Sequence, residues 1–377
     1  MSVCAEVNRG RAQGRQECRP SIYVDEWRRR KCAAFDLRGN STARDVIEFE
    51  LWGAPVRIYA NANLSIYSGQ ACNAKCPFCV EELRPASRGK NLAMQKSVER
   101  DDEIYFRKLG EVLRALKPLN PSASVTGGEP SKDPRLPAIL RTLAEHAARK
   151  RTMTTNGSGL FDVREGRTVL DWIVATGLKH LNISRAHPDC ARNTQLMALR
   201  EGISDAQLQD AAALARAGGV RTRLSCVLLR DAIGNLNGIL RYLDFAERMS
   251  VDNVIFRQLM KTDPTTVEPN FVTRFSDAQR VALEPILDEI SGDARFEFQR
   301  QIVGYYYYVE VWRYGGIDVV FEEADLAQLE RSKRADPGVI HELVFHPNGA
   351  LASTWQPWDG VIANGEKDGL GSPSYVD

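Results

Sequence analysis

The sequence lacks several features that would assign it to other protein classes. It has no apolar run of the about 20 residues needed to span a bilayer, and its arginine-containing start has no apolar segment typical of a secretory signal. With 50 basic and 49 acidic side chains, its net charge of +1 gives no electrostatic footprint for nucleic acid. Eight cysteines in 377 residues are too few for a disulfide framework and fit a reducing compartment. We therefore expect a cytoplasmic protein that binds neither membrane nor nucleic acid.

The first 60 residues predict an N-terminal arm followed by a β-hairpin. Residues 1–45 have weak periodicity, and their basic run at 28–31 fits a solvated face because no aromatic residues interleave it. Residues 46–52 and 56–60 are β-rich, and the Gly-Ala-Pro stretch between them predicts a hairpin turn.

The middle of the chain alternates short apolar segments with amphipathic ones. This pattern predicts strands at 64–67, 123–126, 151–155, 180–184, 220–229 and 253–258, and helices at 103–116, 136–148 and 206–217. Because right-handed crossovers place all helices on one side of a parallel sheet, we expect an α/β fold, a partial (β/α)6 parallel barrel over residues 61–260. The carboxyl ends of its strands should meet at one mouth.

Beyond residue 260 the repetition stops. Residues 262–275 resemble a linker, 277–290 predict an amphipathic helix, and two hairpins are expected at 304–321 and 342–355. We interpret residues 261–377 as an α+β region that forms a lid over the substrate pocket.

Three of the cysteines, Cys72, Cys76 and Cys79, lie within eight residues at the spacing C-x3-C-x2-C. Thiolates this close in sequence can hold one metal centre. Structural zinc normally takes four protein ligands in paired short spacings, and no fourth cysteine or histidine lies near this loop. Three thiolates with an open fourth position instead suit a [4Fe-4S] cluster, with a zinc site as the alternative.

This spacing resembles the signature of the radical S-adenosylmethionine (SAM) enzymes, C-x3-C-x-aromatic-C, with Phe78 as the aromatic residue. A second likeness follows the second predicted strand, where Gly127-Gly128-Glu129-Pro130 is similar to the family's GGEP segment. The resemblance implies that this segment binds the methionyl amino group of SAM. Taken alone, it could equally be a glycine turn before a helix.

Two further strand ends resemble the same family. Thr155 and Asn156 lie in a segment similar to the family's TNG stretch, which implies hydrogen bonds to ribose, although a plain turn would also explain them. The resemblance also implies that Ser184 and Arg185 reach the ribose or the carboxylate of SAM, because arginine pairs with a carboxylate through two hydrogen bonds.

Four more residues near the mouth are candidates for substrate contacts. His187 lies in the loop after the fourth strand, where loop solvation is the alternative. Alternate strand residues face opposite sides, so Arg223 can face the lumen, and one of Arg257 and Gln258 should do so. Inward arginines predict an anionic substrate; outward ones would pair with helix carboxylates instead.

The resemblance covers about residues 60–260 and is nearest to the branch of the molybdenum-cofactor cyclase, but no cysteine follows Cys226 to hold an auxiliary cluster. It implies one [4Fe-4S] cluster, SAM and an external flavodoxin- or ferredoxin-type reductant, which together produce a 5′-deoxyadenosyl radical. We expect this radical to abstract hydrogen from a small, polar, anionic intermediate, in a rearrangement, cyclisation, elimination or epimerisation. The alternatives are a peptide-modifying maturase and a non-catalytic iron-sulfur or zinc module.

Overall fold

The computed structural model describes residues 46–68, 72–83, 98–146, 149–262, 265, 267–304, 306–357 and 359–362. The predicted arm over residues 1–45, with its basic run, lies outside them, as do Cys4, Cys18 and Cys32. Among the helices in these ranges, none is long and apolar enough to cross a membrane.

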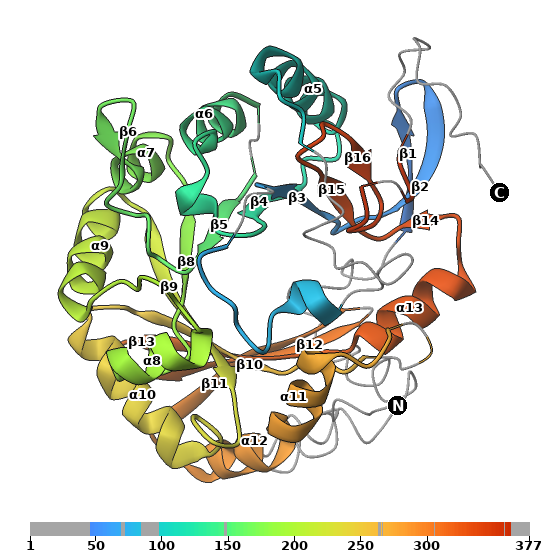
Figure 1. The fold of residues 1–377 in the computed structure, drawn as a ribbon. Helices are drawn as coiled ribbons and strands as arrows, with labels where there is room; N and C mark the ends of the chain where they lie inside the picture. Colours follow the sequence, from blue (N-terminus) through green and yellow to red (C-terminus); the bar gives the residue numbers. More distant parts are fainter. Residues whose placement is uncertain are drawn as a thin grey trace.

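Six parallel strands form the centre of a curved sheet, and helices cover its outer side (Figure 1). In pairing order they are β3 (Asn63–Tyr67), β4 (Ser122–Thr126), β5 (Arg151–Thr155), β8 (His180–Ser184), β9 (Arg221–Leu228) and β10 (Asn253–Gln258). Every boundary lies within one residue of the predicted one. The expected α/β partial barrel is confirmed.

Side-chain caps fix where the outer helices begin. Asp101 accepts from the N–H groups of Glu103 and Ile104 at the start of α5 (Asp102–Ala115), and Ser204 forms a capping box with Gln207 at the start of α9 (Asp205–Ala217). The other outer helices are α6 (Leu136–His146), α7 (Val169–Ala175) and α10 (Leu236–Arg248). The three predicted helices agree with α5, α6 and α9 to within two residues.

The two faces of the parallel strands differ in chemistry. Leu64, Leu181 and Phe256 face the helices and are fully buried in the main apolar core. The alternate residues face inward, and on four neighbouring strands they are polar: Ser124, Thr152, Thr154, Asn182, Ser184, Arg223 and Ser225. In closed barrels bulky aliphatic side chains usually fill the interior. This polar inner face suits a polar ligand.

Strands from the C-terminal third extend the sheet at both edges. At one edge β13 (Ile317–Ala324) pairs in parallel with β10, followed by antiparallel β12 (Tyr307–Tyr314) and β11 (Phe296–Val303). At the other, β15 (Leu343–Phe345) pairs in parallel with β3, followed by β16 (Leu351–Ala352). Both predicted hairpins form. The barrel sheet continues through these strands across the boundary expected at residue 260. The lid role expected for residues 261–377 stays a prediction.

The region between the barrel and these strands differs from the prediction. Two helices, α11 (Phe271–Gln279) and α12 (Leu283–Gly292), replace the single helix expected at 277–290, because Arg280 leaves the helical conformation (φ −59°, ψ 132°). Asn270 forms a capping box, so α11 begins within the expected linker. Asp325 caps a further helix that was not predicted, α13 (Leu326–Ala335).

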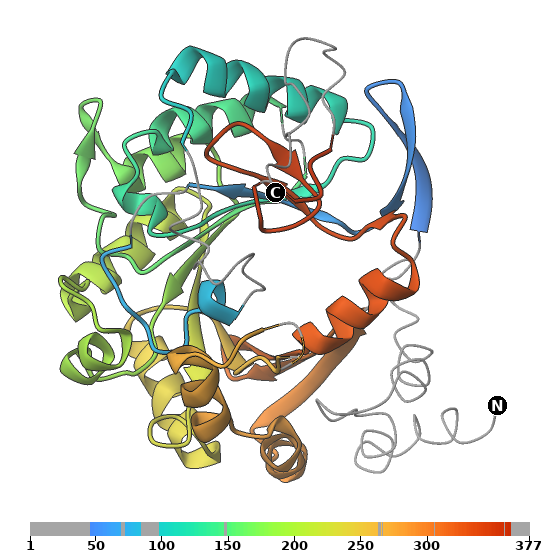
Figure 2. The ribbon, with the colours of Figure 1, turned by 45° about the vertical axis from the view of Figure 1, so that its right-hand side comes forward.

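The predicted N-terminal hairpin is confirmed as β1 (Val46–Leu51) and β2 (Ala54–Tyr59). Its turn residues are Trp52 and Gly53, both left-handed (φ 49° and 76°), as two-residue hairpin turns require. β2 also pairs with β14 (Val339–Ile340), and the hairpin lies on the same side of the barrel as α13 (Figure 2). A second small hairpin joins β6 (Val163–Arg164) and β7 (Arg167–Thr168).

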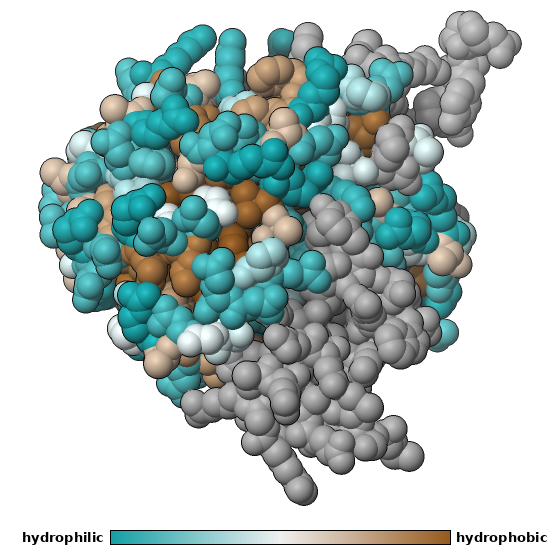
Figure 3. Space-filling view, turned by 90° about the horizontal axis from the view of Figure 1, so that it is seen from below, coloured by the Kyte–Doolittle hydropathy of each residue, from teal (hydrophilic) through white to brown (hydrophobic). Residues whose placement is uncertain are grey.

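The described surface mixes polar and apolar side chains. Seen from below, hydrophilic residues surround a patch of hydrophobic ones (Figure 3). The most exposed large apolar side chains are Phe271 (64% exposed) and Val163 (62%). Single exposed apolar side chains of this kind are usual on protein surfaces.

A chain that ends at Met260 should fail to form a stable barrel. It would lack β13 and β15, so β10 and β3 would become unprotected sheet edges, which are prone to aggregate. Thermal unfolding followed by circular dichroism, on residues 1–260 and on the full chain, checks this. An equally soluble short chain with the same cooperative transition would show that the barrel does not need its C-terminal strands.

Candidate functional site

The cysteine loop follows β3 at the mouth of the barrel. The Cys79 N–H donates to the Cys76 carbonyl at 3.2 Å and closes a tight turn, after which the short helix η1 (Val80–Leu83) begins. Cys72 is exposed, whereas Cys76 and Cys79 are half-buried, and all three are free thiols. The loop thus presents its sulfur atoms from one turn at the strand ends.

The end of α8 (Cys190–Met197) holds this loop in place. The Lys75 N–H donates to the Met197 and Ala198 carbonyls at 3.2 Å each, and the Cys76 thiol donates to the Met197 carbonyl at 3.4 Å. Ala198 ends the helix in the left-handed conformation (φ 46°). Cysteine spacing alone could not reveal this support, because it comes from a helix more than a hundred residues later.

The three thiols share one electrostatic environment. Burial raises the pKa of Cys76, and negative charge on Cys79 and Cys72 raises it further. Burial also raises the pKa of Cys72, with a smaller contribution from the Glu129 carboxylate. Three neighbouring thiolates repel one another unless a cationic centre lies among them, so this donor set fits an iron-sulfur cluster. Within the described ranges, no three Cys, His, Asp or Glu side chains are placed to hold a single metal ion.

Glu129 lies at the end of β4 and is buried (1% exposed). Its Oε1 accepts from the Ser131 N–H at 2.9 Å and the Ser131 hydroxyl at 2.6 Å, and also from the Thr155 hydroxyl. Its Oε2 accepts from the Asn156 N–H at 2.7 Å. Burial raises the pKa of Glu129, and these hydrogen bonds oppose that rise. In this structure Glu129 joins the ends of β4 and β5, and its contact with the ammonium group of SAM stays a prediction.

The rest of the GGEP segment shapes a tight connection. Gly127 has a φ of 129°, which favours glycine, and Pro130 begins the short helix η3 (Pro130–Lys132). The hydroxyl of Ser131 accepts from the Gly159 N–H at 3.0 Å. A Cβ atom at position 159 would lie 2.5 Å from the Ser131 carbonyl oxygen, so only glycine fits there. Sequence reasoning missed Ser131, although its place directly after GGEP was a signal.

Asn156 connects the loop after β5 to the cysteine loop. Its amide donates to Asn73 Oδ1 at 2.7 Å and lies 3.9 Å from the Cys72 sulfur. Asn73 in turn donates to the Ser158 hydroxyl at 3.0 Å. The structure thus brings Asn156 to the cysteines, while ribose contacts from Thr155 and Asn156 stay predictions. Asn73 was missed because it occupies a variable position of the motif.

Arg185 lies in the interior rather than at the open mouth. Its side chain is fully buried (0% exposed), and its guanidinium donates to the His187 and Pro188 carbonyls at 2.9 and 2.8 Å and to Asp205 at 2.6 Å. These internal partners anchor the loop to the start of α9, and the predicted cofactor contact of Arg185 stays a prediction. Ser184 is half-buried on the inner face, and its cofactor contact stays a prediction.

His187 stays in the loop after β8. Its Nδ1 accepts from the Asp189 N–H at 3.1 Å, which fixes the ring within its own loop. Burial lowers its pKa. Its predicted substrate contact is not tested by this placement.

The predicted substrate residues of β10 face opposite sides. Arg257 faces inward, and its Nε donates to Glu322 of β13 at 2.9 Å. Gln258 is buried (3% exposed), and its amide donates to the Val281 carbonyl at 2.5 Å in the helix layer. Of the two, Arg257 is therefore the one that faces inward, and the substrate contacts of both stay predictions.

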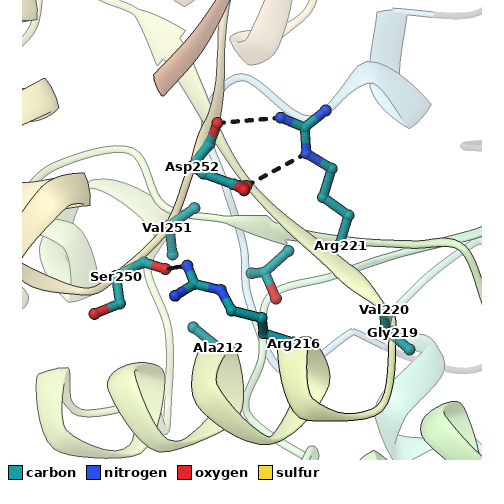
Figure 4. Close-up of a pocket in the computed structure, with 9 residues that line it drawn as sticks. Ala212, Arg216, Gly219, Val220, Arg221, Ser250, Val251 and Asp252 are labelled. Carbon is teal, nitrogen blue, oxygen red and sulfur yellow. Dashed lines mark hydrogen bonds and ion pairs between the residues drawn. The ribbon is translucent and has the colours of Figure 1, made fainter. Parts of the chain in front are cut away.

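Arg223 also faces inward but lies near the beginning of β9 rather than at the mouth. Its Nε donates to the Asn253 side chain. A separate cavity of about 220 Å³ opens at this lower end of β9 and β10, where Arg221 pairs with Asp252 at 3.3 Å (Figure 4). The cysteines lie at the opposite ends of the strands, so this cavity is not part of the mouth.

Comparisons with known proteins agree with this arrangement. The family model for the radical SAM superfamily matches residues 66–238. GTP 3′,8-cyclase from Tolumonas auensis is 33% identical over 170 residues, which is 43% of this chain and 43% of that protein. The chain thus spans less than half the length of this curated relative.

Two solved structures illustrate the likeness in fold. Streptococcus suis SuiB bound to the precursor peptide SuiA is 15% identical, with 82% of this chain and 64% of that chain covered and a TM-score of 0.48. Coproporphyrinogen III oxidase from Escherichia coli is 16% identical, with 62% and 52% covered and a TM-score of 0.39.

Replacing Glu129 with alanine should destabilise the protein even without any ligand. The change leaves the Ser131, Thr155 and Asn156 donors without their buried acceptor, so we expect a loss of about 2–4 kcal/mol in the free energy of unfolding. Urea unfolding measures this loss, with the exposed Glu289→Ala in α12 as the control that stays within about 0.5 kcal/mol. Unchanged stability without ligand, combined with lost SAM binding, would show that Glu129 acts on SAM and not on the strand ends.

Asp133 is a second buried carboxylate, just after η3 (0% exposed). Its Oδ1 accepts from the Arg135 N–H at 2.9 Å, and Oδ2 has no hydrogen-bond partner among the described residues. Burial raises the pKa of Asp133 from 3.8 to about 6. Between these values the folded protein keeps a proton that the unfolded chain has lost, so this group's contribution to stability falls as the pH rises.

Asp133→Asn should therefore be more stable than the wild type above pH 6, by roughly 1–3 kcal/mol, and gain nothing below about pH 4. The amide keeps an oxygen that can accept from the Arg135 N–H. Free energies of unfolding measured in urea between pH 4 and pH 7 check this. Parallel pH profiles for the two proteins would refute it.

Proposed function

Because residues 66–238 form a radical SAM domain, we propose that this protein is an enzyme that reductively cleaves SAM at one [4Fe-4S] cluster. The observation that carries the proposal is a loop with three free thiols at the strand ends of a parallel barrel, where the Asn156 amide lies 3.9 Å from the Cys72 sulfur. When bound, the cluster and SAM supply a 5′-deoxyadenosyl radical able to abstract hydrogen.

The chain's own residues would hold the cluster through Cys72, Cys76 and Cys79. Three protein thiolates leave one iron without a protein ligand, as SAM binding requires. The Met197 and Ala198 carbonyls fix the loop from one side, and Asn156 approaches Cys72 from the other. These contacts orient the thiols before any metal binds.

The residues assigned to SAM form the rim around this loop. Gly127 and Gly128 give backbone access, and Glu129, which fixes that backbone through Ser131, is assigned to the amino group of SAM. Phe78 packs against Phe275 of α11, with ring centroids 6.3 Å apart, and covers the outer side of the cysteine loop. We assign Pro130, Thr155, Asn156 and Ser184 to the same rim.

We propose a small, polar, anionic metabolite as the substrate. The polar inner face with inward Arg223 and Arg257 supports this choice. The name of the curated relative, a GTP 3′,8-cyclase, describes an anionic nucleotide and agrees with it. With no cysteine after Cys226 to hold a second cluster, we propose a redox-neutral rearrangement, cyclisation, elimination or epimerisation. A flavodoxin- or ferredoxin-type protein would supply the electron.

Anaerobic reconstitution should give about four irons per chain and reductant-dependent cleavage of SAM to 5′-deoxyadenosine. Changing Cys72, Cys76 or Cys79 to alanine should abolish both. Cys226→Ala is the matched control, because this thiol is fully buried behind the sheet and should affect neither readout. One zinc per chain without cleavage would instead support a non-catalytic module, and acceleration of cleavage only by peptides would support a maturase.

A further inference from the structure

The lower half of the barrel lumen contains polar atoms that no described residue satisfies. Asn182 Oδ1 and His180 Nδ1 on β8 are buried without a hydrogen-bond partner. On the neighbouring strand, Arg223 uses only its Nε, toward Asn253, and its two terminal nitrogens have no partner within the described ranges. The strand register places Asn182 directly beside Arg223. Because buried polar groups are nearly always partnered, these atoms need a polar partner, which a water molecule or a polar group of a ligand can supply.

Charge singles out Arg223 among its neighbours. Below it, Arg221 pairs with Asp252 at 3.3 Å and Asp318 at 2.6 Å, and above it, Arg257 pairs with Glu322 at 2.9 Å. Arg223 has no ion pair with any described carboxylate.

Both positive and negative groups act on Arg223. Burial lowers its pKa to about 10, the positive charges of Arg257 and Arg221 lower it further, and Glu322 and Asp318 oppose them, so Arg223 stays protonated near neutral pH. The exposed Lys150 and Arg300 add positive charge from below. A half-buried cation without a counter-charge is costly, and an anion bound here would remove that cost.

We propose that Arg223, with Asn182 beside it, forms an oxyanion-binding site at the floor of the lumen for a carboxylate or phosphate group of the substrate. The site rests on the proposed function for its role, but its chemistry belongs to these two side chains. Asn182 supplies an amide beside the guanidinium, whereas the charge of Arg257 is already paired with Glu322.

The site also fixes the orientation and size of the substrate. Arg223 lies five residues before the end of β9 at Leu228, which corresponds to roughly 16 Å of extended strand. The anionic group therefore points away from the cysteine loop while the reacting carbon faces the mouth. A substrate that satisfies both ends is elongated or of nucleotide size, not a molecule of a few atoms.

The test compares two arginines on the same face of the same strand. In Arg223→Gln, the affinity of the cluster-reconstituted full chain for inorganic phosphate and for succinate, measured by calorimetry, should fall about tenfold to a hundredfold. Arg221→Gln, whose charge is already paired, is the matched control and should change either affinity less than twofold. Comparison of the phosphate and succinate affinities shows which oxyanion the proposed site prefers.

Asn182→Ala provides a second variant should Arg223→Gln fold poorly, and its affinity for the preferred anion should also fall. Equal binding by wild type, Arg223→Gln and Asn182→Ala overturns the inference, and so does an equal loss in Arg221→Gln. SAM cleavage by the same preparations separates the two proposals. Cleavage without Arg223-dependent binding rejects the floor site alone, whereas Arg223-dependent binding without cleavage rejects the enzymatic proposal alone.

Discussion

The buried carboxylate of Glu129 holds the mouth of this barrel together. A carboxylate with 1% exposure is stable only when donors surround it, and here they come from Ser131, Thr155 and Asn156 on two strand ends. Asn156 then continues the network to the cysteine loop through Asn73. The position of the thiols thus depends on a buried carboxylate, so the residue that the sequence predicts as a SAM ligand also holds two strand ends together.

Sequence patterns that span only a few residues predicted the strands and the cysteine loop, because neighbouring residues determine both. Alternating apolar segments located six strands because each strand buries one face against helices, and the cysteine spacing located the loop because its ligands are neighbours in the chain. Side-chain direction was harder to predict. Arg185 and Gln258 lie at strand ends, as expected, but their partners Asp205 and Val281 lie about 20 residues away and take them into the interior. The position of a residue in a motif therefore indicates where it lies in the fold, whereas partners far away in the sequence decide which way its side chain points.

The C-terminal strands also show that long-range pairing cannot be predicted from local sequence. The hairpins were visible in the sequence, but nothing local indicates that β13 adds to β10. That addition brings Glu322 beside Arg257 and neutralises one of the two inward arginines. The charge available to a ligand is therefore set jointly by strands that are 65 residues apart in the chain, and it could not be read from either strand alone.

The pairing of β15 with β3 has a consequence for biosynthesis. Leu343 lies opposite Leu64, so the edge beside the first barrel strand is completed only after synthesis has passed Phe345. The cysteine loop, by contrast, emerges early, directly after β3. At typical elongation rates of about 5–20 residues per second, its thiols wait for more than ten seconds on a nascent chain before that edge is covered. During this interval they are open to oxygen and stray metals, so the cell has to keep these thiols reduced until β15 has paired with β3.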